Sequence, residues 1–116
     1  PYTTLFRSTI GRLITKQNFG GLPVVGDDGA LLGLVTEYDL LQAMIEGRDL
    51  RKVLASEIMT TAPLTAREEM LLDEVANLFQ DRYVTRLPVV RGKKLVGLVA
   101  RRDLLHGYMQ ASAYWS

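Results

Sequence analysis

The chain contains no cysteine, and its longest apolar stretches, such as residues 30–35, are only about six residues long. Without cysteine there are no disulfides and no thiolate chemistry, which fits a reducing compartment such as the cytoplasm. A membrane-spanning helix needs about 20 apolar residues, and no signal peptide is recognisable. We therefore expect a cytoplasmic protein that does not engage a membrane.

The chain also lacks an excess of charge of either sign. It has 14 Lys and Arg residues against 13 Asp and Glu residues, for a net charge of +1. Proteins that bind long nucleic acids need a basic surface to neutralise phosphates, so nucleic acid is a disfavoured partner.

Residues for catalysis are scarce as well. The single histidine, His106, lies on an expected helix beside two leucines, where a solvated or structurally satisfied residue is far more common than a general base. No phosphate-binding glycine loop and no metal-ligand spacing is present, and no carboxylate pair stands out as acid and base. We expect no enzymatic activity, no metal site and no required cofactor.

What the chain does have is a repeat. Leu-Pro-Val-Val occurs at 22–25 and again at 87–90, and Gly-Leu-Val, three variable residues and Asp-Leu-Leu occur at 33–41 and again at 97–105. Core packing requires only apolar residues of suitable size, so it does not explain why Asp39 returns as Asp103. Repetition at a fixed period indicates one structural unit made twice, and the repeated aspartate suggests a repeated site.

The length of 116 residues suits one domain or two small halves. A half of about 55 residues buries too little surface to be secure alone, so the halves should pack on each other. The first copy has fewer residues before its Leu-Pro-Val-Val than the second, and the chain has no initiator methionine. We expect it to be processed, trimmed or part of a longer protein.

Hydrophobic periodicity and turn residues predict the elements. In the first copy we expect a helix from Ser8 or Thr9 to before Asn18, strands at 22–25 and 31–35 around a turn at 26–29, and a helix at 37–46 capped by Gly47. A polar connector with one possible helical turn follows at 48–57. In the second copy we expect a strand at 63–65, a helix around 72–79, strands at 87–90 and 95–99 around a turn at 92–93, and a helix from Arg101 to about Met109.

Each repeated aspartate lies where a strand becomes a helix. In the first copy, Thr36 and Asp39 could form a reciprocal capping box. In the second copy Ala100 replaces the threonine, so the box is lost although Asp103 remains. The carboxylate could remain for the helix dipole, or because it accepts hydrogen bonds from ligand hydroxyls, and a vicinal diol such as ribose suits its two oxygens.

The two junctions differ in charge. Glu37 and Asp39 give the first a charge of −2, whereas Arg101, Arg102 and Asp103 give the second +1. Backbone N–H groups at a helix start favour anions, so a phosphate would prefer the second junction. The alternative is that both arginines simply lie on a solvated helix face.

These motifs, in this order and twice over, with Glu-Ile-Met-Thr at 57–60 before the second copy, resemble a tandem pair of cystathionine-β-synthase (CBS) domains, also called a Bateman module. The resemblance covers essentially the whole chain. It implies a mixed α/β fold of the α+β type, in which two β-α-β-β-α repeats pack sheet to sheet about a pseudo-twofold axis. We expect residues 1–50 to form the first repeat, short at its N-terminus, and residues 51–116 to form the second.

The resemblance also implies two clefts between the repeats that hold adenosine-containing ligands: AMP, ADP, ATP or S-adenosylmethionine. Asp39 and Asp103 match the family's ribose-binding aspartate, and Thr36 matches its phosphate-side hydroxyl, which Ala100 lacks. Arg101 or Arg102 could substitute there. The remaining matches are a segment that reaches the base or ribose and two strand edges that flank the base, namely Thr60, Thr61, Ala62 and Pro63, then Gly21, Leu22 and Pro23, and Arg86, Leu87 and Pro88.

Two expected helices carry more apolar residues than one core-facing stripe needs, namely Leu40, Leu41, Met44 and Ile45 in the first copy and Leu104, Leu105, Tyr108 and Met109 in the second. In the resembling family these helices form a dimer face, so we expect a homodimer. Tyr114 and Trp115 could pack on the chain's own core or mark a contact with another chain.

The sequence thus favours a regulatory module that binds an adenosine-containing small molecule and acts on a fused or separate effector domain by shifting a conformational population. The alternative is a structural dimerisation module with clefts that bind nothing. A nucleic-acid-binding module ranks third and a catalytic role last.

Overall fold

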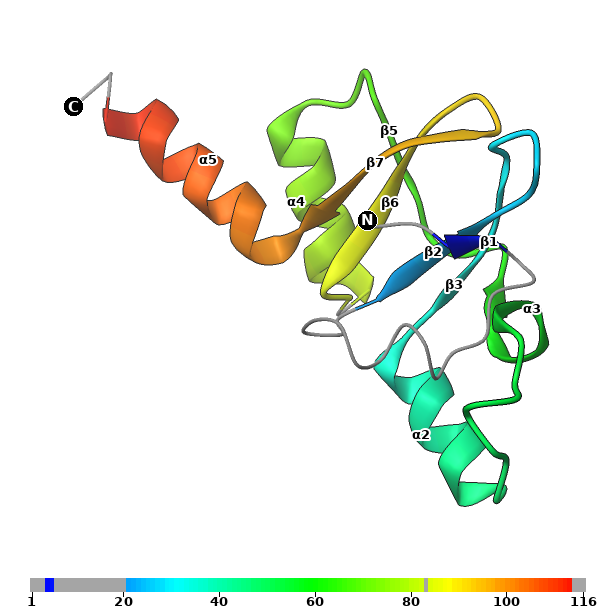
Figure 1. Cartoon of the computed structure of the whole chain (residues 1–116). Coiled ribbons are helices and arrows are strands. Elements are labelled where there is room, and N and C mark those ends of the chain that lie inside the picture. Colours follow the sequence, from blue (N-terminus) through cyan, green and yellow to red (C-terminus); the bar gives the residue numbers. More distant parts are fainter. Residues whose placement is uncertain (1–3, 6–20, 83, 114–116) are drawn as a thin grey trace.

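The computed structural model describes residues 4–5, 21–82 and 84–113. It contains two sheets, ordered β1-β2-β3-β4 and β5-β6-β7, with helices packed around them (Figure 1). The elements of the first sheet and its helices are β1 (Thr4–Leu5), β2 (Leu22–Val25), β3 (Leu31–Val35), α2 (Glu37–Ile45), α3 (Ala55–Ile58) and β4 (Thr60–Thr61). Those of the second are β5 (Ala66–Arg67), α4 (Leu72–Arg82), β6 (Arg86–Arg91), β7 (Lys94–Ala100) and α5 (Arg101–Ala113).

The second repeat has the complete predicted order, β5-α4-β6-β7-α5. In the first repeat, β2 and β3 have the predicted bounds, and α2 ends one residue earlier than predicted. The helix expected from Ser8 or Thr9 lies outside the described residues, as do Tyr114 and Trp115. The mixed α/β pair of repeats is therefore confirmed.

The turns follow from their residues. Gly26 N–H donates to the carbonyl of Ala30 at 3.0 Å, and Gly29 has a φ of 84°, a conformation that glycine adopts without steric cost. At the end of α2, Gly47 also has a positive φ, and the N–H groups of Gly47 and Arg48 donate to the carbonyls of Met44 and Ala43. This bonding pattern is the glycine-terminated helix end predicted from Gly47.

One predicted strand is in the wrong place. Residues 63–65 are not a strand. Instead, β4 pairs with β3 in the first sheet, and β5 pairs with β6 in the second. Proline has no N–H for a sheet, and the residue before Pro63, Ala62, has a φ of 50°, so the chain turns there. The segment that introduces the second repeat thus first adds a strand to the first repeat.

The two hairpins, β2-β3 and β6-β7, meet at their tips (Figure 1). Leu31 N–H donates to the carbonyl of Lys93 at 2.9 Å, and Leu95 N–H donates to the carbonyl of Gly29 at 3.1 Å. The same offset of 64 relates Gly29 to Lys93 (93 minus 29) and Leu31 to Leu95 (95 minus 31). The two bonds are therefore copies of each other, and Ala30 bridges Lys94 between them.

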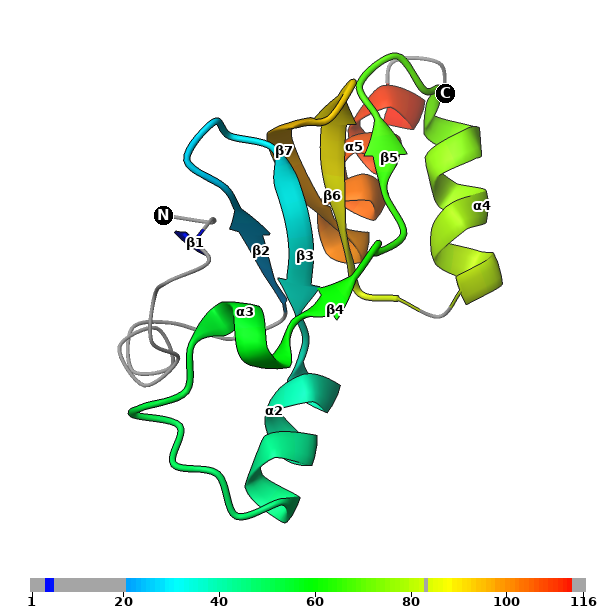
Figure 2. The same cartoon turned by 90° about the vertical axis from the view of Figure 1, so that its right-hand side faces the viewer.

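Each sheet also has its own core. The buried residues of the first are Val24, Val35, Val53 and Ala55, and those of the second are Ala66, Phe79, Leu87 and Leu104. Figure 2 shows α4 and α5 beside the second sheet, α3 beside β3 and β4, and α2 below them. The two strand–helix junctions thus lie in separate repeats.

Candidate functional site

The first junction joins β3 to α2. Thr36 is the N-cap, with its hydroxyl accepting from the Asp39 N–H at 3.2 Å. In return, Oδ2 of Asp39 accepts from the Thr36 N–H at 2.8 Å and from its hydroxyl at 2.9 Å. The capping box predicted from these two residues is therefore present. It holds the Asp39 carboxylate, which is half-buried, in one orientation at the start of the helix.

A third residue reaches the same carboxylate from a distant part of the sequence. The Thr60 hydroxyl lies 3.1 Å from both Oδ1 and Oδ2 of Asp39. Pairing of β4 with β3, with Thr60 opposite Leu34, places this hydroxyl beside the junction. The sequence predicted both Thr60 and Asp39 as ligand-contacting residues, but it assigned Thr60 to the segment that introduces the second copy and did not place it beside Asp39.

Gly33 makes the close approach of β4 possible. A Cβ atom built on Gly33 would lie 2.6 Å from Sδ of Met59 and 2.7 Å from the carbonyl oxygen of Thr60. Real side chains do not tolerate such distances, so the neighbouring strand β4 requires a glycine at this position. Gly33 and Met59 were missed as site residues. The signal that could have found Gly33 is its repetition at Gly97.

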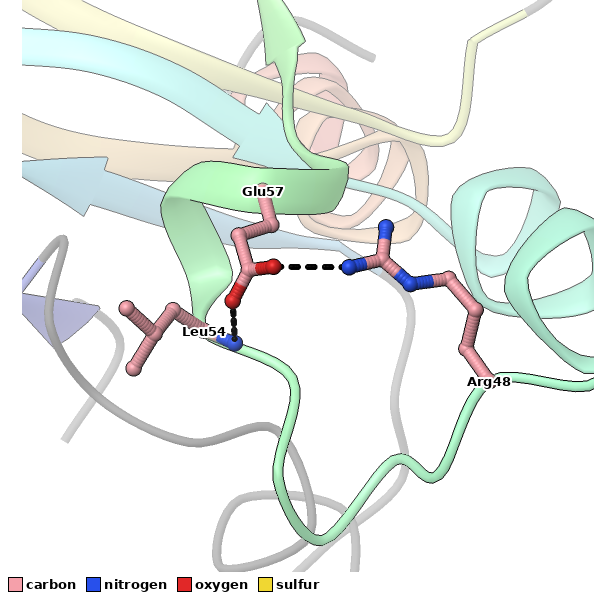
Figure 3. A network of polar contacts seen from close by, with 3 residues as sticks. All are labelled: Arg48, Leu54 and Glu57. Atoms are coloured by element: carbon pink, nitrogen blue, oxygen red, sulfur yellow. Dashed lines mark hydrogen bonds and ion pairs between the residues drawn. The ribbon is translucent and has the colours of Figure 1, made fainter.

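The segment before β4 is fastened by a small polar network (Figure 3). Oε1 of Glu57 accepts from the Leu54 N–H at 2.9 Å, and Oε2 accepts from Nη2 of Arg48 at 2.7 Å. The Leu54 N–H bond, followed by the Arg48 guanidinium, lowers the pKa of Glu57 below its ordinary value. Glu57 thereby caps α3, and α3 sets the course of the chain toward Thr60.

The described residues form fewer hydrogen bonds at the second junction, from β7 to α5, than at the first. Oδ2 of Asp103 accepts from the Ala100 N–H at 3.3 Å, so half of the capping box persists without a threonine. Arg101, Arg102 and Asp103 are all exposed, and neither arginine forms an ion pair with another described residue. The Arg101 N–H donates to the carbonyl of Thr85 at 3.0 Å.

The strand-edge residues divide into core residues and inter-repeat contacts. Pro23, Leu87 and Pro88 are fully buried, and Leu22 is half-buried, so their side chains belong to the core. Gly21 and Arg86, which are equivalent in the repeat, face each other. A Cβ on Gly21 would lie 3.8 Å from Cβ of Arg86.

Three further residues follow Thr60 along the chain. Thr61 and Ala62 are exposed and Pro63 is half-buried. Ala62 has the left-handed backbone described above, which costs an L-residue roughly 1–2 kcal/mol. Strained residues of this kind persist where the surroundings fix them, often beside binding sites.

Together these groups offer oxygen acceptors for hydroxyl donors at both junctions and cationic side chains at the second junction only. In the described part of the chain, no cluster of His, Cys, Asp and Glu residues is arranged to hold a metal ion. Likewise, no helix among the described residues is long and apolar enough to cross a membrane.

One helix also presents an uncovered apolar surface. Tyr38, Leu41, Met44 and Ile45 of α2 are 72%, 57%, 59% and 79% exposed. Leu40 faces the other way and packs on the first core. On α5, Leu104 is buried and Leu105 is 60% exposed, while the side chains of Tyr108 and Met109 lie outside those that the structure describes.

Comparison with known proteins agrees with this architecture. The CBS domain model matches residues 7–46 and 55–109. The CBS domain-containing protein YhcV of Bacillus subtilis is 36% identical over 93 residues, which is 79% of this chain and 65% of that protein. The chain spans 60–65% of the length of the two Bacillus subtilis relatives that it matches.

Two solved structures show the same fold with ligands bound. CBSX2 in complex with AMP is 28% identical, with a TM-score of 0.79 over 95% of this chain and 88% of that one. The CBS domain pair of MJ0100 in complex with 5-methylthioadenosine and S-adenosyl-L-methionine is 28% identical, with a TM-score of 0.78 over 96% of this chain and 90% of that one. With its repeated junctions and two matched segments, the chain belongs to the CBS domain family, as a pair of CBS repeats.

Proposed function

We propose that the chain is a regulatory module that binds an adenosine-containing small molecule, such as AMP, ADP, ATP or S-adenosylmethionine, between its two repeats. The observation that carries this proposal is the repeated aspartate at a strand–helix junction, exposed at Asp103. A carboxylate there can accept both hydroxyls of a ribose. The AMP and S-adenosyl-L-methionine complexes of similar structures support this ligand class.

The site would be built from both repeats. Asp39 and Thr36 would meet the ligand at the first junction, where Thr60 lies beside the Asp39 carboxylate. Asp103, Arg101 and Arg102 would meet it at the second. The segment 60–63 would reach the base or ribose, and the strand edges 21–23 and 86–88 would flank the base. We propose that residues 1–50 and 51–116 form the two repeats, with β4 of the second segment completing the first sheet.

The charges predict which junction takes a phosphate. The first has a formal charge of −2 and the second of +1, and like charges disfavour a phosphate over short distances even when salt screens them. Asp103→Ala should therefore weaken AMP binding more than Asp39→Ala does. Because Asp39→Ala also breaks the capping box, the free energy of unfolding is measured alongside, and calorimetry showing the reverse order would overturn the charge argument.

The test of binding is thermal unfolding with AMP, ADP, ATP, S-adenosylmethionine and NAD. A ligand at 100 times its dissociation constant stabilises a protein by about 2.7 kcal/mol, which raises Tm by several degrees for a domain of this size. No shift with any compound at millimolar concentration would reject ligand sensing.

A second candidate function is a structural dimerisation module whose clefts bind nothing. The exposed apolar face of α2 favours it, since such a surface is typical of a contact with another chain. Dimerisation by itself is compatible with ligand binding in one molecule, whereas clefts that bind nothing are not. What separates them is ligand binding, because a ligand-sensing module would pass the bound state to a fused or separate effector domain, whereas a structural module would only hold two copies together.

A further inference from the structure

The two repeated carboxylates, Asp39 and Asp103, differ in how many hydrogen bonds they accept from other groups of the chain. Asp39 accepts from the Thr36 N–H, the Thr36 hydroxyl and the Thr60 hydroxyl. Among the described residues, Asp103 accepts one bond, from the Ala100 N–H at 3.3 Å. Since a carboxylate has about four acceptor positions, Asp39 is nearly saturated and Asp103 is largely free.

We propose that Thr60 is an internal competitor for the hydroxyl-binding position at Asp39. This inference rests on the proposed function, in which both aspartates bind ligand hydroxyls. The Thr60 hydroxyl contacts both oxygens of Asp39 at once, as the two hydroxyls of a vicinal diol would. A diol therefore binds Asp103 first, and it binds Asp39 only after displacing the Thr60 hydroxyl.

This competition would couple ligand binding at Asp39 to the attachment of β4 to the first sheet. Thr60 belongs to β4, and β4 is part of the segment that connects the two repeats. Its side chain is exposed, so the hydroxyl can turn away, but doing so removes one of the contacts that hold β4 on the first sheet. Binding at Asp39 and release of β4 are then thermodynamically linked, and each must favour the other to the same extent.

The substitution that tests this inference is Thr60→Val, which keeps the branched shape and strand preference of threonine but removes the hydroxyl. If Thr60 competes, the variant binds a diol at Asp39 more tightly, by roughly five- to tenfold for an exposed bond to a carboxylate. If Thr60 instead helps to hold the ligand, affinity at Asp39 falls. The neighbouring exposed Thr61, replaced in Thr61→Val, is the matched control.

NMR titration with AMP reads the two junctions separately, through the amide signals of Asp39 and Asp103. We expect wild type to respond to AMP first at Asp103, Thr60→Val to gain affinity at Asp39 alone, and Thr61→Val to match wild type. With 2′-deoxyadenosine monophosphate, which lacks the diol, the gain should disappear.

The outcomes separate the two proposals. Wild-type binding with no gain, or with a loss, at Asp39 of Thr60→Val would overturn the competition and leave ligand sensing intact. Binding to neither wild type nor Thr60→Val would overturn both. A variant that binds where wild type does not would support the competition strongly. In the ligand-free protein, Thr60→Val should also speed hydrogen exchange of the β3 and β4 amides relative to Thr61→Val, and equal exchange would count against the contact.

Discussion

The close pairing of β4 with β3 at Gly33 can be tested with a pair of equivalent substitutions, Gly33→Ala and Gly97→Ala. The two glycines occupy the same position of the repeat, and neither has a positive φ. At Gly33 a Cβ would collide with Met59 and with the carbonyl oxygen of Thr60, at 2.6 and 2.7 Å. At Gly97 its nearest neighbour would be Cβ of Val89 at 3.8 Å, an ordinary contact.

The expected effects have opposite signs. Overpacking of this kind costs about 1–3 kcal/mol, and the Thr60 carbonyl can move only if β4 leaves the sheet edge. Gly97→Ala should instead stabilise by about 0.4–1 kcal/mol, because alanine restricts the unfolded chain. The two variants should therefore differ by roughly 1.4–4 kcal/mol, or about 6–16 °C in Tm for a domain of this size.

Calorimetry measures this difference, and hydrogen exchange locates it. Gly33→Ala should expose the amides of β4 while leaving those of β6 and β7 protected. Equal melting temperatures for the two variants would refute the argument that β4 requires Gly33. So would a loss of stability in Gly33→Ala without faster exchange in β4, since the cost would then arise elsewhere.

Three further predictions concern assembly, capping and pH. In solution we expect a dimer near 26 kDa, twice the chain mass of 13.0 kDa, that Ile45→Glu disrupts and the exposed control Gln42→Glu does not; light scattering that finds a monomer for wild type at high micromolar concentration would contradict it. Ala100→Thr should complete the second capping box and stabilise by about 1 kcal/mol, seen as a higher urea midpoint; an unchanged midpoint would show that the box does not form. Because the pKa of Glu57 is lowered in the folded state, its contribution is present above the ordinary value of 4.5 and is lost as pH falls through the folded pKa. The stability gap between wild type and Glu57→Gln should therefore close on acidification, and a gap independent of pH would exclude the charge as its cause.

The repeat predicted the fold well because its signals are local. The Leu-Pro-Val-Val strands, the turn ending at Gly29 and the helix end at Gly47 each depend on residues a few positions apart. The capping box of Thr36 and Asp39 was weighed against a ligand site, and the structure contains the box. Whether Asp39 also binds a ligand stays a prediction.

What the sequence did not predict are the contacts between distant segments. The strand expected at 63–65 is absent because the chain passes from the first sheet to the second there. It turns at Ala62, between β4 and β5. The bond from Thr60 to Asp39 spans 21 residues, and no spacing rule describes it. The repetition of Gly33 at Gly97 hinted at a close approach, yet only the structure shows that β4 makes that approach at Gly33.

The segment between α2 and β4 runs back beside α2. Side-chain hydrogen bonds hold it near both ends of that helix. Arg48, just beyond its C-terminal end, holds Glu57, and Asp39, in its first turn, holds Thr60. Only the second fastening lies at a junction where we propose a ligand. A double-mutant cycle of Glu57→Gln and Thr60→Val measures whether the two act together, because independent sites give additive free energies of unfolding and coupled ones do not. We expect coupling, since Thr60 follows Glu57 by only three residues along the chain. Strict additivity would mean that a ligand displacing Thr60 loosens β4 alone and leaves the rest of the connecting segment in place.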